Sequence, residues 1–368
     1  MKLSQFSFNL PEEQIALYPH SVYHEIKGEK GKKQTVRVTR RDECRLMVLH
    51  RQSGTIDMFK QDKKKKPVKG DFLDFRNVLD YFDEGDTFIF NDTKVVKARI
   101  FGKKQSGGET ELLLNSPLAD GKFSVYIKGK VHAGSVLNFG ENLTAEVCEL
   151  FDDGSRTVKF SQNGQFLDTA ALYGILSRIG HVPLPPYIKR SDTKDDENWY
   201  QSVFAKNEGA VAAPTASLHF SDEMIARLAK DREIAYLTLH VGAGTFKGVE
   251  SEDITQHKMH AEFYDIPQDT QNLINSNRPI LGVGTTVTRC VEEFARSGKS
   301  SGECRLFLNL NNRPIRQNYL LTNFHLPKST LIMLVTSFVG LKQTMRIYKT
   351  AVEQKYKFYS YGDAMLVI

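Results

Sequence analysis

Short apolar runs alternate with short polar breaks between residues 86 and 160. The runs are rich in Val, Ile, Phe and Thr, and breaks that contain Gly, Asn or Asp follow about every 8–12 residues. Four of these runs read TFIFN, KVVKARIFG, FSVYIKG and LTAEVCEL. Strands of this length and spacing are typical of a small all-β sandwich or barrel.

After this region the pattern changes to alternating helix and strand signals. Ser221 stands before two acidic residues and an apolar periodic stretch, which is typical of a helix N-cap. Residues 235–241 alternate strictly between two sets of side chains, as in a strand with two different faces. An apolar run at 279–281 leads through a glycine-containing loop into a helical pattern at 289–296, which Gly298 is expected to end.

We therefore predict a mixed α/β protein. Residues 1–84 and 163–368 form a discontinuous α/β layer domain, and residues 85–162 form an inserted small all-β, barrel-like domain. A chain of 368 residues is long enough for two such domains. The charged fraction of 26% and the aromatic fraction of 10% exclude a disordered or coiled-coil chain.

The positive charge is concentrated in two segments. Residues 21–41 contain seven Lys or Arg and two Glu, which gives +5, and residues 61–70 contain five Lys and one Asp, which gives +4. The whole chain carries only +6. A local basic surface favours phosphates and therefore a polynucleotide partner. The alternative is that both segments are solvated surface loops, which their Gly, Lys and Pro content also favours.

Other features of the composition indicate the compartment. The four cysteines lie far apart without a CxxC pair, which predicts free thiols rather than a disulfide framework or a zinc site. The longest apolar stretch, Leu331–Leu341, is shorter than the roughly 20 residues that cross a bilayer. The N-terminal sequence has no continuous apolar segment of the secretory kind. We expect a cytoplasmic protein that does not contact a membrane.

Two glycine-containing loops follow predicted strands and are candidates for ligand binding. Residues 242–245 read GAGT, and residues 284–286 read GTT. Consecutive backbone amides at a strand end or a helix N-terminus favour an anionic group. Neither loop completes a GxGxxG pattern, because Lys247 and Val287 stand at the final position, so a dinucleotide-binding fingerprint is not supported. Each loop is also compatible with an ordinary tight turn.

The histidines permit several interpretations. Residues 209–220 read GAVAAPTASLHF, and the small side chains in this stretch allow a backbone or a ligand to approach closely. A single histidine such as His219 is more often a hydrogen-bonded structural residue than a catalytic one. His257 and His260 lack HExxH spacing, and on a strand His260 would share a face with Glu262 while His257 faces the other way, so no metal site is expected.

Several blocks together resemble one known family. They run in order along the whole chain and include LPEEQIALYP (10–19), GDTFIFNDTKVVKARIFG (85–102), GAVAAPTASLHF (209–220), LTLHVGAGTF (237–246), TNFHLPKSTL (322–331) and YSYGDAMLVI (359–368). They resemble the S-adenosylmethionine:tRNA ribosyltransferase-isomerases of queuosine biosynthesis. Segments 21–40 and 61–70 look like expansions relative to that family, and Lys94 stands where the family usually has Arg.

The resemblance implies a particular reaction. The ribosyl part of S-adenosylmethionine would move, with isomerisation, onto 7-aminomethyl-7-deazaguanine at the wobble position of tRNA. Epoxyqueuosine-tRNA would form, and adenine and methionine would leave. S-adenosylmethionine is then the ribosyl-donating substrate, no metal is needed, and we expect a monomer. The alternatives are a non-catalytic tRNA- or RNA-binding module and a metal-dependent hydrolase that uses His257 and His260.

This chemistry needs a base near the ribose C5′ hydrogen, which the adjacent sulfonium acidifies, and a proton or hydrogen-bond donor for the departing adenine. The expected catalytic residues are His219, His240, Glu262 and Asp253. The expected donor-binding residues are Thr215, Gly242, Ala243, Gly244, Thr245, Gly284, Thr285 and Thr286. The expected tRNA-binding residues are Arg45, Lys94, Arg99, Lys189 and Arg190 for phosphates, and Asn323, Phe324 and His325 for a base.

Overall fold

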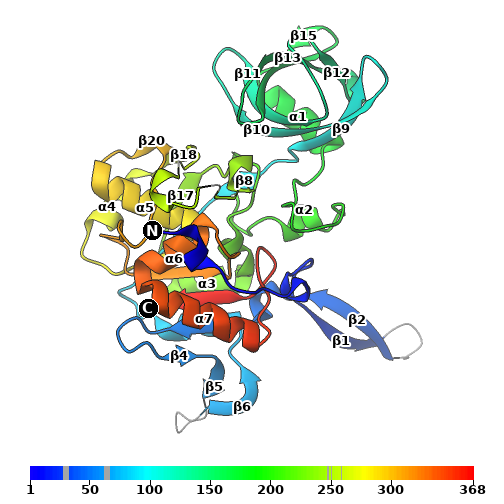
Figure 1. Cartoon of the computed structure of the whole chain (residues 1–368). Coiled ribbons are helices and arrows are strands. Elements are labelled where there is room, and N and C mark those ends of the chain that lie inside the picture. The colour runs from blue at the N-terminus through cyan, green and yellow to red at the C-terminus, as the bar shows by residue number, and fades with distance from the viewer. Residues whose placement is uncertain (28–32, 62–66, 247, 250, 258) are drawn as a thin grey trace.

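A large mixed sheet forms the centre of the protein. The computed structural model describes residues 1–27, 33–61, 67–246, 248–249, 251–257 and 259–368. Within these residues the sheet has nine strands in the order β20-β18-β17-β7-β19-β21-β22-β3-β4 (Figure 1). In that order the strands span Ser301–Cys304, Glu262–Asp265, Glu233–Leu239, Thr87–Asn91, Ile280–Val283, Tyr319–Asn323, Ala364–Val367, Leu46–Leu49 and Ile56–Asp57.

Helices cover both faces of this sheet, and strand β7 shows how. Every residue of β7 is buried, as expected for a parallel strand that is covered on both sides. Phe88 and Phe90 lie in the apolar cluster that α3 (Asp222–Asp231) joins. Ile89 lies in the cluster on the other face, which α5 (Thr285–Ser297) joins. The strand runs parallel to β17 and β19 on either side of it.

Further helices complete these layers. Helices α6 (Thr330–Val339) and α7 (Leu341–Glu353) belong to one apolar cluster with residues of β3 and β22. Helix α4 (Gln268–Asn275) contacts β17 and α5. Apart from α1 (Thr169–Ile179), which packs on the barrel, the other helical segments of the described residues are α2 (Asp196–Trp199) and the short 3₁₀ helices Leu3–Phe6, Glu12–Gln14, Arg41–Glu43, Phe75–Tyr81, Gly140–Asn142, Thr215–His219, Ala243–Phe246 and Ile254–Gln256.

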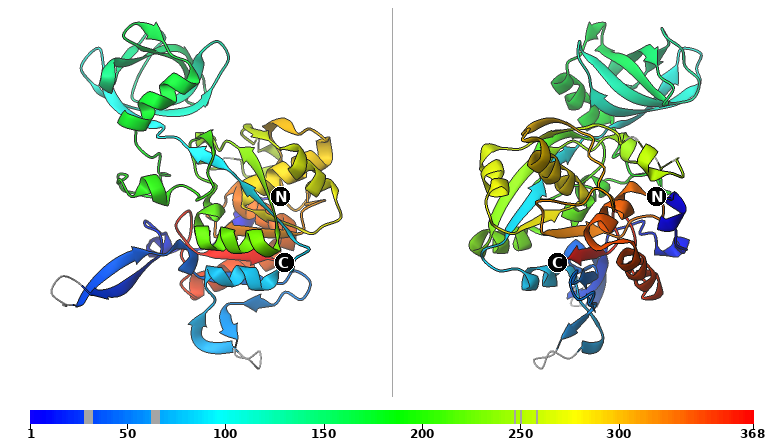
Figure 2. Two further views of the ribbon diagram at one scale, coloured as in Figure 1. Left: turned by 180° about the vertical axis from the view of Figure 1, so that it is seen from behind. Right: turned by 60° about the vertical axis from the view of Figure 1, so that its left-hand side comes forward.

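A closed antiparallel barrel stands beside the sheet domain (Figures 1 and 2). Its described strands are β9 to β14, and the ring closes because β11 pairs with β14 as well as with β10. Helix α1 (Thr169–Ile179) buries Leu172 and Leu176 in the barrel core. The strands, including the short β15 that extends the sheet, span Arg99–Lys104, Glu109–Pro117, Lys122–Lys128, Val136–Asn138, Leu143–Leu150, Ser155–Gln162 and Gln165–Phe166.

The mixed α/β class with a barrel is confirmed, but the barrel unit does not have the boundaries expected from the sequence. Strand β7, within the predicted insert 85–162, belongs to the nine-stranded sheet, and α1, beyond residue 162, packs on the barrel. The structural unit therefore runs from β9 to α1. The sequence TFIFN is compatible both with a strand of a barrel and with a buried strand of a parallel sheet. Only its pairing with the distant strands β17 and β19 shows which of the two it is.

Two antiparallel hairpins project from the sheet domain (Figure 1). One consists of β1 (Ser21–Lys27) and β2 (Lys33–Thr39), and the other of β5 (Phe59–Gln61) and β6 (Pro67–Phe72). The two basic segments of the sequence fall on these hairpins, with residues 28–32 and 62–66 outside the described residues. A further pair, β8 (Thr93–Val95) and β16 (Asn207–Ala210), is parallel.

Three local predictions are confirmed. The Ser221 side chain accepts a hydrogen bond from the backbone of Met224 and caps α3. Gly298 ends α5 with a φ of 68°, in the left-handed region that favours glycine. The four cysteines are free thiols. None of the helices in the described parts of the chain has the length and apolar content to cross a membrane.

Candidate functional site

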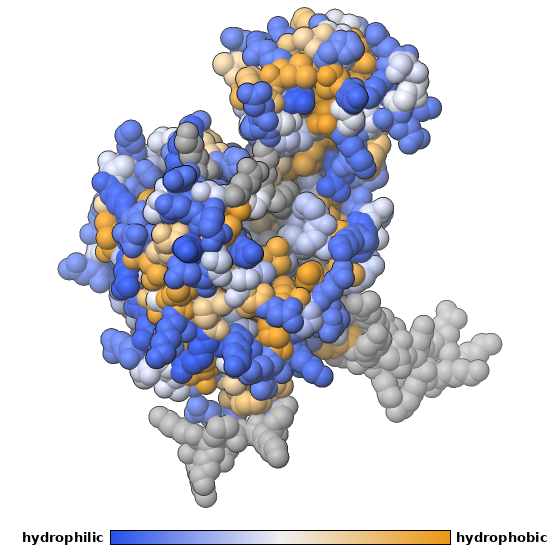
Figure 3. All heavy atoms as spheres, in the orientation of Figure 1, coloured by the Kyte–Doolittle hydropathy of each residue, from blue (hydrophilic) through white to orange (hydrophobic). Residues whose placement is uncertain are grey.

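A cavity of about 440 Å³ lies where three parallel strands end. The ends of β17, β19 and β21 and the segments that follow them line it with residues 244–245, 284–286, 322–323 and 325–331. Residues 212–216 and 359–360 complete the wall next to β21. In open α/β sheets, ligands bind beyond the carboxyl ends of parallel strands, so the topology favours this position for a site. Figure 3 shows apolar side chains gathered in the recess between the sheet domain and the barrel.

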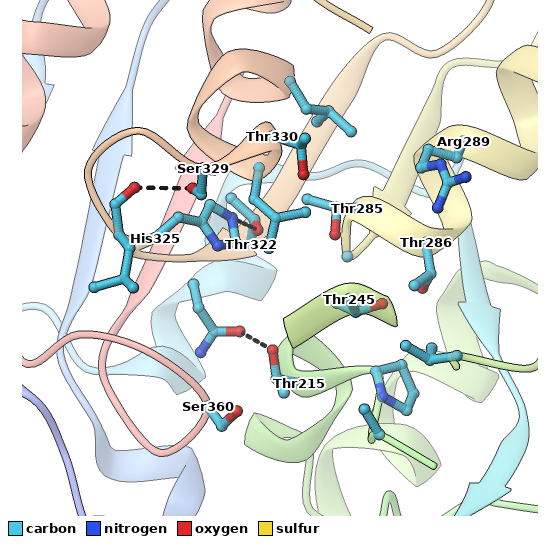
Figure 4. A pocket seen from close by; sticks show the side chains of 18 of the residues that line it. Thr215, Thr245, Thr285, Thr286, Arg289, Thr322, His325, Ser329, Thr330 and Ser360 are labelled. Carbon is cyan, nitrogen blue, oxygen red and sulfur yellow. Dashed lines mark hydrogen bonds between the residues drawn. The ribbon is translucent and has the colours of Figure 1, made fainter. Parts of the chain in front are cut away.

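Hydroxyl groups and helix N-termini surround this cavity. Figure 4 shows Thr215, Thr245, Thr285 and Thr286 around a common space. Helix α5 begins there after its N-cap Gly284, which offers no side-chain cap to the first amides, and α6 begins there after Ser329. Amide groups at a helix N-terminus attract carboxylates and phosphates, and hydroxyls suit a sugar. The cavity can therefore hold a polar ligand that carries an anionic group.

A buried ion pair braces one side of the cavity. The Arg289 guanidinium pairs with Oε2 of Glu262, and both side chains are less than a tenth exposed. Oε1 of Glu262 accepts hydrogen bonds from Oγ1 of Thr245 at 3.0 Å and from the backbone of Gly242 at 3.3 Å. Arg289 also donates to the carbonyl of Cys304 at 3.0 Å. The pair thus ties the GAGT loop to α5.

The structure does not place His219 on the cavity. Its Nε2 accepts a hydrogen bond of 2.9 Å from Nδ2 of Asn323, and its Nδ1 lies 3.2 Å from Sγ of Cys44. Asn323 in turn accepts from Oγ1 of Thr215 and donates to the carbonyl of Tyr359. Burial lowers the pKa of His219 to about 3, so its ring is neutral at pH 7. His219 therefore positions Asn323, which does line the cavity.

Three other predicted residues do not lie where their expected roles require. His240 is half-buried and contacts Oγ1 of Thr93 at 2.8 Å, and burial lowers its pKa. Asp253 caps a 3₁₀ helix and lies 3.4 Å from the N-terminal amine of Met1. Phe324 is fully buried in the core beneath α6, so it has no free face for a base. The described lining of the cavity includes none of these three.

Three histidines do border the cavity. His325 contacts Oγ1 of Thr322 at 2.8 Å, and burial lowers its pKa to about 3. His257 and His260 precede β18, which begins at Glu262, and both line the cavity. Neither histidine lies on a strand, so the arrangement on opposite faces that a strand would have imposed does not occur. Among the described residues there is no cluster of three His, Cys, Asp or Glu side chains that could hold a metal ion.

The residues predicted to bind the donor fall into two groups, because only some of them line the cavity. The amide of Gly242 is engaged by Glu262, and the amide of Ala243 donates to Oδ1 of Asn115 at 2.9 Å. Asn115 belongs to β10, so the barrel directly contacts the GAGT loop. The backbone amides of Gly242 and Ala243 are therefore already bonded to other residues of the protein, and neither residue lines the cavity. The predicted residues that do line the cavity are Thr215, Gly244, Thr245, Gly284, Thr285 and Thr286.

The five basic residues predicted to bind phosphates all have partners within the protein, and the described cavity lining includes none of them. Lys94 pairs with Glu208, Arg99 with Glu111, Lys189 with Glu12 and Arg190 with Asp196, and Arg45 lies over the Phe72 ring. Arg190 donates two hydrogen bonds of 2.7 and 2.8 Å to the fully buried Asp196, which indicates a structural role. The pairs of Lys94 and Lys189 are exposed and leave both ammonium groups near solvent.

Several lining residues were not identified from the sequence. Arg289 was missed, although a charge among the apolar positions of a helix was a usable signal for a buried pair. Tyr187, Tyr200 and Tyr359 also line the cavity. Tyr187 and Tyr200 lie in one segment and Tyr359 lies far from it in the sequence, and no local pattern connects the three.

The chain matches the family described as Queuosine biosynthesis protein over residues 3–367. It belongs to this family. A relative from Campylobacter concisus is 67% identical over 306 residues, covering 83% of this chain and 89% of the relative. A relative from Campylobacter fetus is 54% identical over 366 residues, covering 100% of this chain and 98% of the relative. Both are named S-adenosylmethionine:tRNA ribosyltransferase-isomerase.

One solved structure has a similar fold over the whole chain. The S-adenosylmethionine tRNA ribosyltransferase from Thermotoga maritima superposes with a TM-score of 0.50 and is 28% identical. The match covers 99% of this chain and 100% of that protein. The resemblance predicted from the sequence blocks is thereby confirmed.

Proposed function

We propose that this member of the queuosine biosynthesis family is an S-adenosylmethionine:tRNA ribosyltransferase-isomerase. The enzyme moves the ribosyl part of S-adenosylmethionine onto 7-aminomethyl-7-deazaguanine at the wobble position of tRNA and releases adenine and methionine. The family match over residues 3–367 carries this proposal. A cavity large enough for a small-molecule ligand supports a catalyst rather than a simple RNA-binding module. On this proposal the protein acts as a monomer in the cytoplasm, where tRNA is found, and needs no metal.

The cavity provides complementary groups for the donor. The amides of Thr285 and Thr286, which begin α5, would receive the methionine carboxylate, whereas the amide of Gly284 already donates to the carbonyl of Leu321 at 2.8 Å. The hydroxyls of Thr215 and Thr245 would contact the ribose. Apolar residues such as Leu308 and Leu334 border the same space and would exclude water while the epoxide forms.

His260 is the proposed base for the ribose C5′ proton. It lies at the cavity, and a side chain added at Gly244 would come within 2.8 Å of its ring, so the ring is held against the loop that contacts the donor. His260 is exposed, unlike His219 and His325. We expect His260→Gln to slow single-turnover product formation by about 100-fold or more, in the range of general-base catalysis. His132→Gln, at an exposed histidine of the barrel, is the matched control and should react like the wild type.

Mass spectrometry of the tRNA tests the whole proposal. The protein is incubated with S-adenosylmethionine and tRNA that carries 7-aminomethyl-7-deazaguanine, and the nucleosides are then analysed. We expect epoxyqueuosine to appear together with equal amounts of adenine and methionine. The same tRNA with guanine at the wobble position should give no product. Absence of product from the modified tRNA would contradict the proposed function.

A further inference from the structure

Two tyrosines form a stacked pair at one end of the cavity. The rings of Tyr187 and Tyr359 lie 3.7 Å apart between centroids, at an interplanar angle of 23°. Both residues line the cavity and are partly exposed. No other aromatic ring of the described residues contacts either of them. Each ring therefore shares one face with the other, and the pair presents an aromatic surface without a further aromatic partner.

The backbone of Tyr359 is held in a costly conformation. Its φ is 73°, in the left-handed region that aromatic residues rarely adopt. Two hydrogen bonds reach its carbonyl, from Nδ2 of Asn323 at 3.1 Å and from the amide of Gly362 at 2.9 Å, and its own amide donates to Phe324 at 2.9 Å. Strained conformations persist where the surroundings enforce them, and they cluster at ligand sites. These contacts fix the place of the ring at the cavity.

The hydroxyl of Tyr359 at this end is buried and has no hydrogen-bond partner among the described residues. The hydroxyl of Tyr200, a residue that is only 1% exposed, lies near Ser360 and the backbone of Ala213 without a hydrogen bond of good geometry to either. Both residues line the cavity. A buried hydroxyl without a partner is unfavourable, and in native proteins such groups are usually satisfied by water or a ligand. The hydroxyl of Tyr187, in contrast, lies 2.6 Å from Oγ of Ser360.

We propose that the Tyr187–Tyr359 pair binds a planar purine-type base and that the hydroxyl of Tyr200 contacts the edge of this base. Aromatic side chains stack on bases through their π faces, and hydroxyls can donate to or accept from ring nitrogens and exocyclic groups. Figure 4 shows Ser360, which follows Tyr359 in the chain and contacts the hydroxyl of Tyr187, on the opposite side of the cavity from Arg289. The charged pair thus lies away from the aromatic end, where an uncharged base fits.

This inference rests on the proposed function, because that reaction brings two such bases to the enzyme. One is the adenine of S-adenosylmethionine, and the other is the deazaguanine of the tRNA. The test compares Tyr359→Leu, which removes the aromatic face, with Tyr359→Phe, which keeps it. Isothermal titration calorimetry measures the affinity of each variant for two probes: S-adenosylmethionine, and an anticodon stem-loop that carries 7-aminomethyl-7-deazaguanine.

We expect Tyr359→Leu to weaken the binding of at least one probe by about 10- to 100-fold, the usual effect of losing one base–aromatic stack. Tyr359→Phe should bind both probes within about threefold of the wild type, because stacking does not need the hydroxyl. The probe that is affected identifies the source of the base. Equal losses in the Leu and Phe variants, or no loss in either, would overturn the inference.

Two further measurements keep the result interpretable. Thermal unfolding shows whether Tyr359→Leu is folded, and if it is not, Tyr187→Leu and Tyr187→Phe provide the same comparison on the other ring. Product formation by the wild type separates the two claims. If the wild type makes epoxyqueuosine while the folded Leu variant binds both probes normally, only the base-binding assignment is wrong. If the wild type makes no product, the proposed function itself is wrong.

Discussion

Replacing Arg289 by Met removes the counter-ion of a carboxylate that is only 6% exposed. Met keeps the unbranched apolar stem of Arg but has no guanidinium group and cannot donate, so Glu262 is left buried without its charge partner. The carbonyls of Cys304 and Leu306 also lose their bonds from the guanidinium. Breaking one side of a buried ion pair costs about 3–5 kcal/mol. We therefore expect the free energy of unfolding to fall by about 4 kcal/mol, in the middle of this range.

A double-mutant cycle separates the pair from the packing around it. Glu262→Gln alone leaves the Arg289 guanidinium buried without a counter-ion. The double variant contains neither of the two charges. The double variant should therefore cost less than the sum of the two single changes, by about 2 kcal/mol. Urea unfolding, followed by circular dichroism, gives the four free energies. If Arg289→Met costs less than about 1 kcal/mol and the single effects simply add, the pair does not brace the cavity wall.

Three further perturbations test other parts of the chain. Asn115→Ala leaves the amide of Ala243 without its acceptor and should cost about 1–3 kcal/mol in urea unfolding, and Ser124→Ala, which spares that bond, should cost less. The folded-state pKa of His219 is about 3, below about 6.5 in the unfolded chain, so the unfolded state binds the proton first and stability falls as the pH drops below 6.5. Between pH 7 and pH 5, protonation of His219 in the unfolded chain should lower the free energy of unfolding by about 2 kcal/mol. The His219→Gln variant should lack this contribution. Equal decreases in the variant and the wild type would contradict the assignment. Replacing Lys63–Lys66 by Gln should reduce the slope of log affinity for tRNA against log salt by about 3 if each lysine meets a phosphate, and an unchanged slope would identify them as solvated surface.

The elements predicted correctly depend on local signals. The cap at Ser221, the alternation along β17 and the glycine after α5 each involve residues within a few positions of one another. Strand β7 was assigned to the wrong domain because its apolar run is compatible with both sheets. Its neighbours β17 and β19 come about 150 to 190 residues later, so only the folded chain shows where it belongs.

The loops of the candidate site could be predicted from the sequence, but the roles of its individual residues could not. Glycine and threonine after two strands indicated a ligand site, and the structure brings Thr245 and Thr286 to one cavity. The burial of His219 depends on Cys44 and Asn323, which lie far from it in sequence. Reactivity of a histidine follows from such distant partners, and a sequence pattern therefore could not distinguish His219 from His260.

The C-terminal strand β22 lies between β21 and β3 and is their shared neighbour in the sheet. Leu46 pairs with Ala364. During protein synthesis, β3 and β4 therefore leave the ribosome long before β22, the strand that connects them to the other strands of the sheet. At about 5–20 residues per second, this interval lasts roughly 15–60 seconds. During that time β3 carries an open edge, a hazard for association with other nascent chains. Chaperone supply and growth temperature are therefore the variables that should decide how much unaggregated protein a cell delivers.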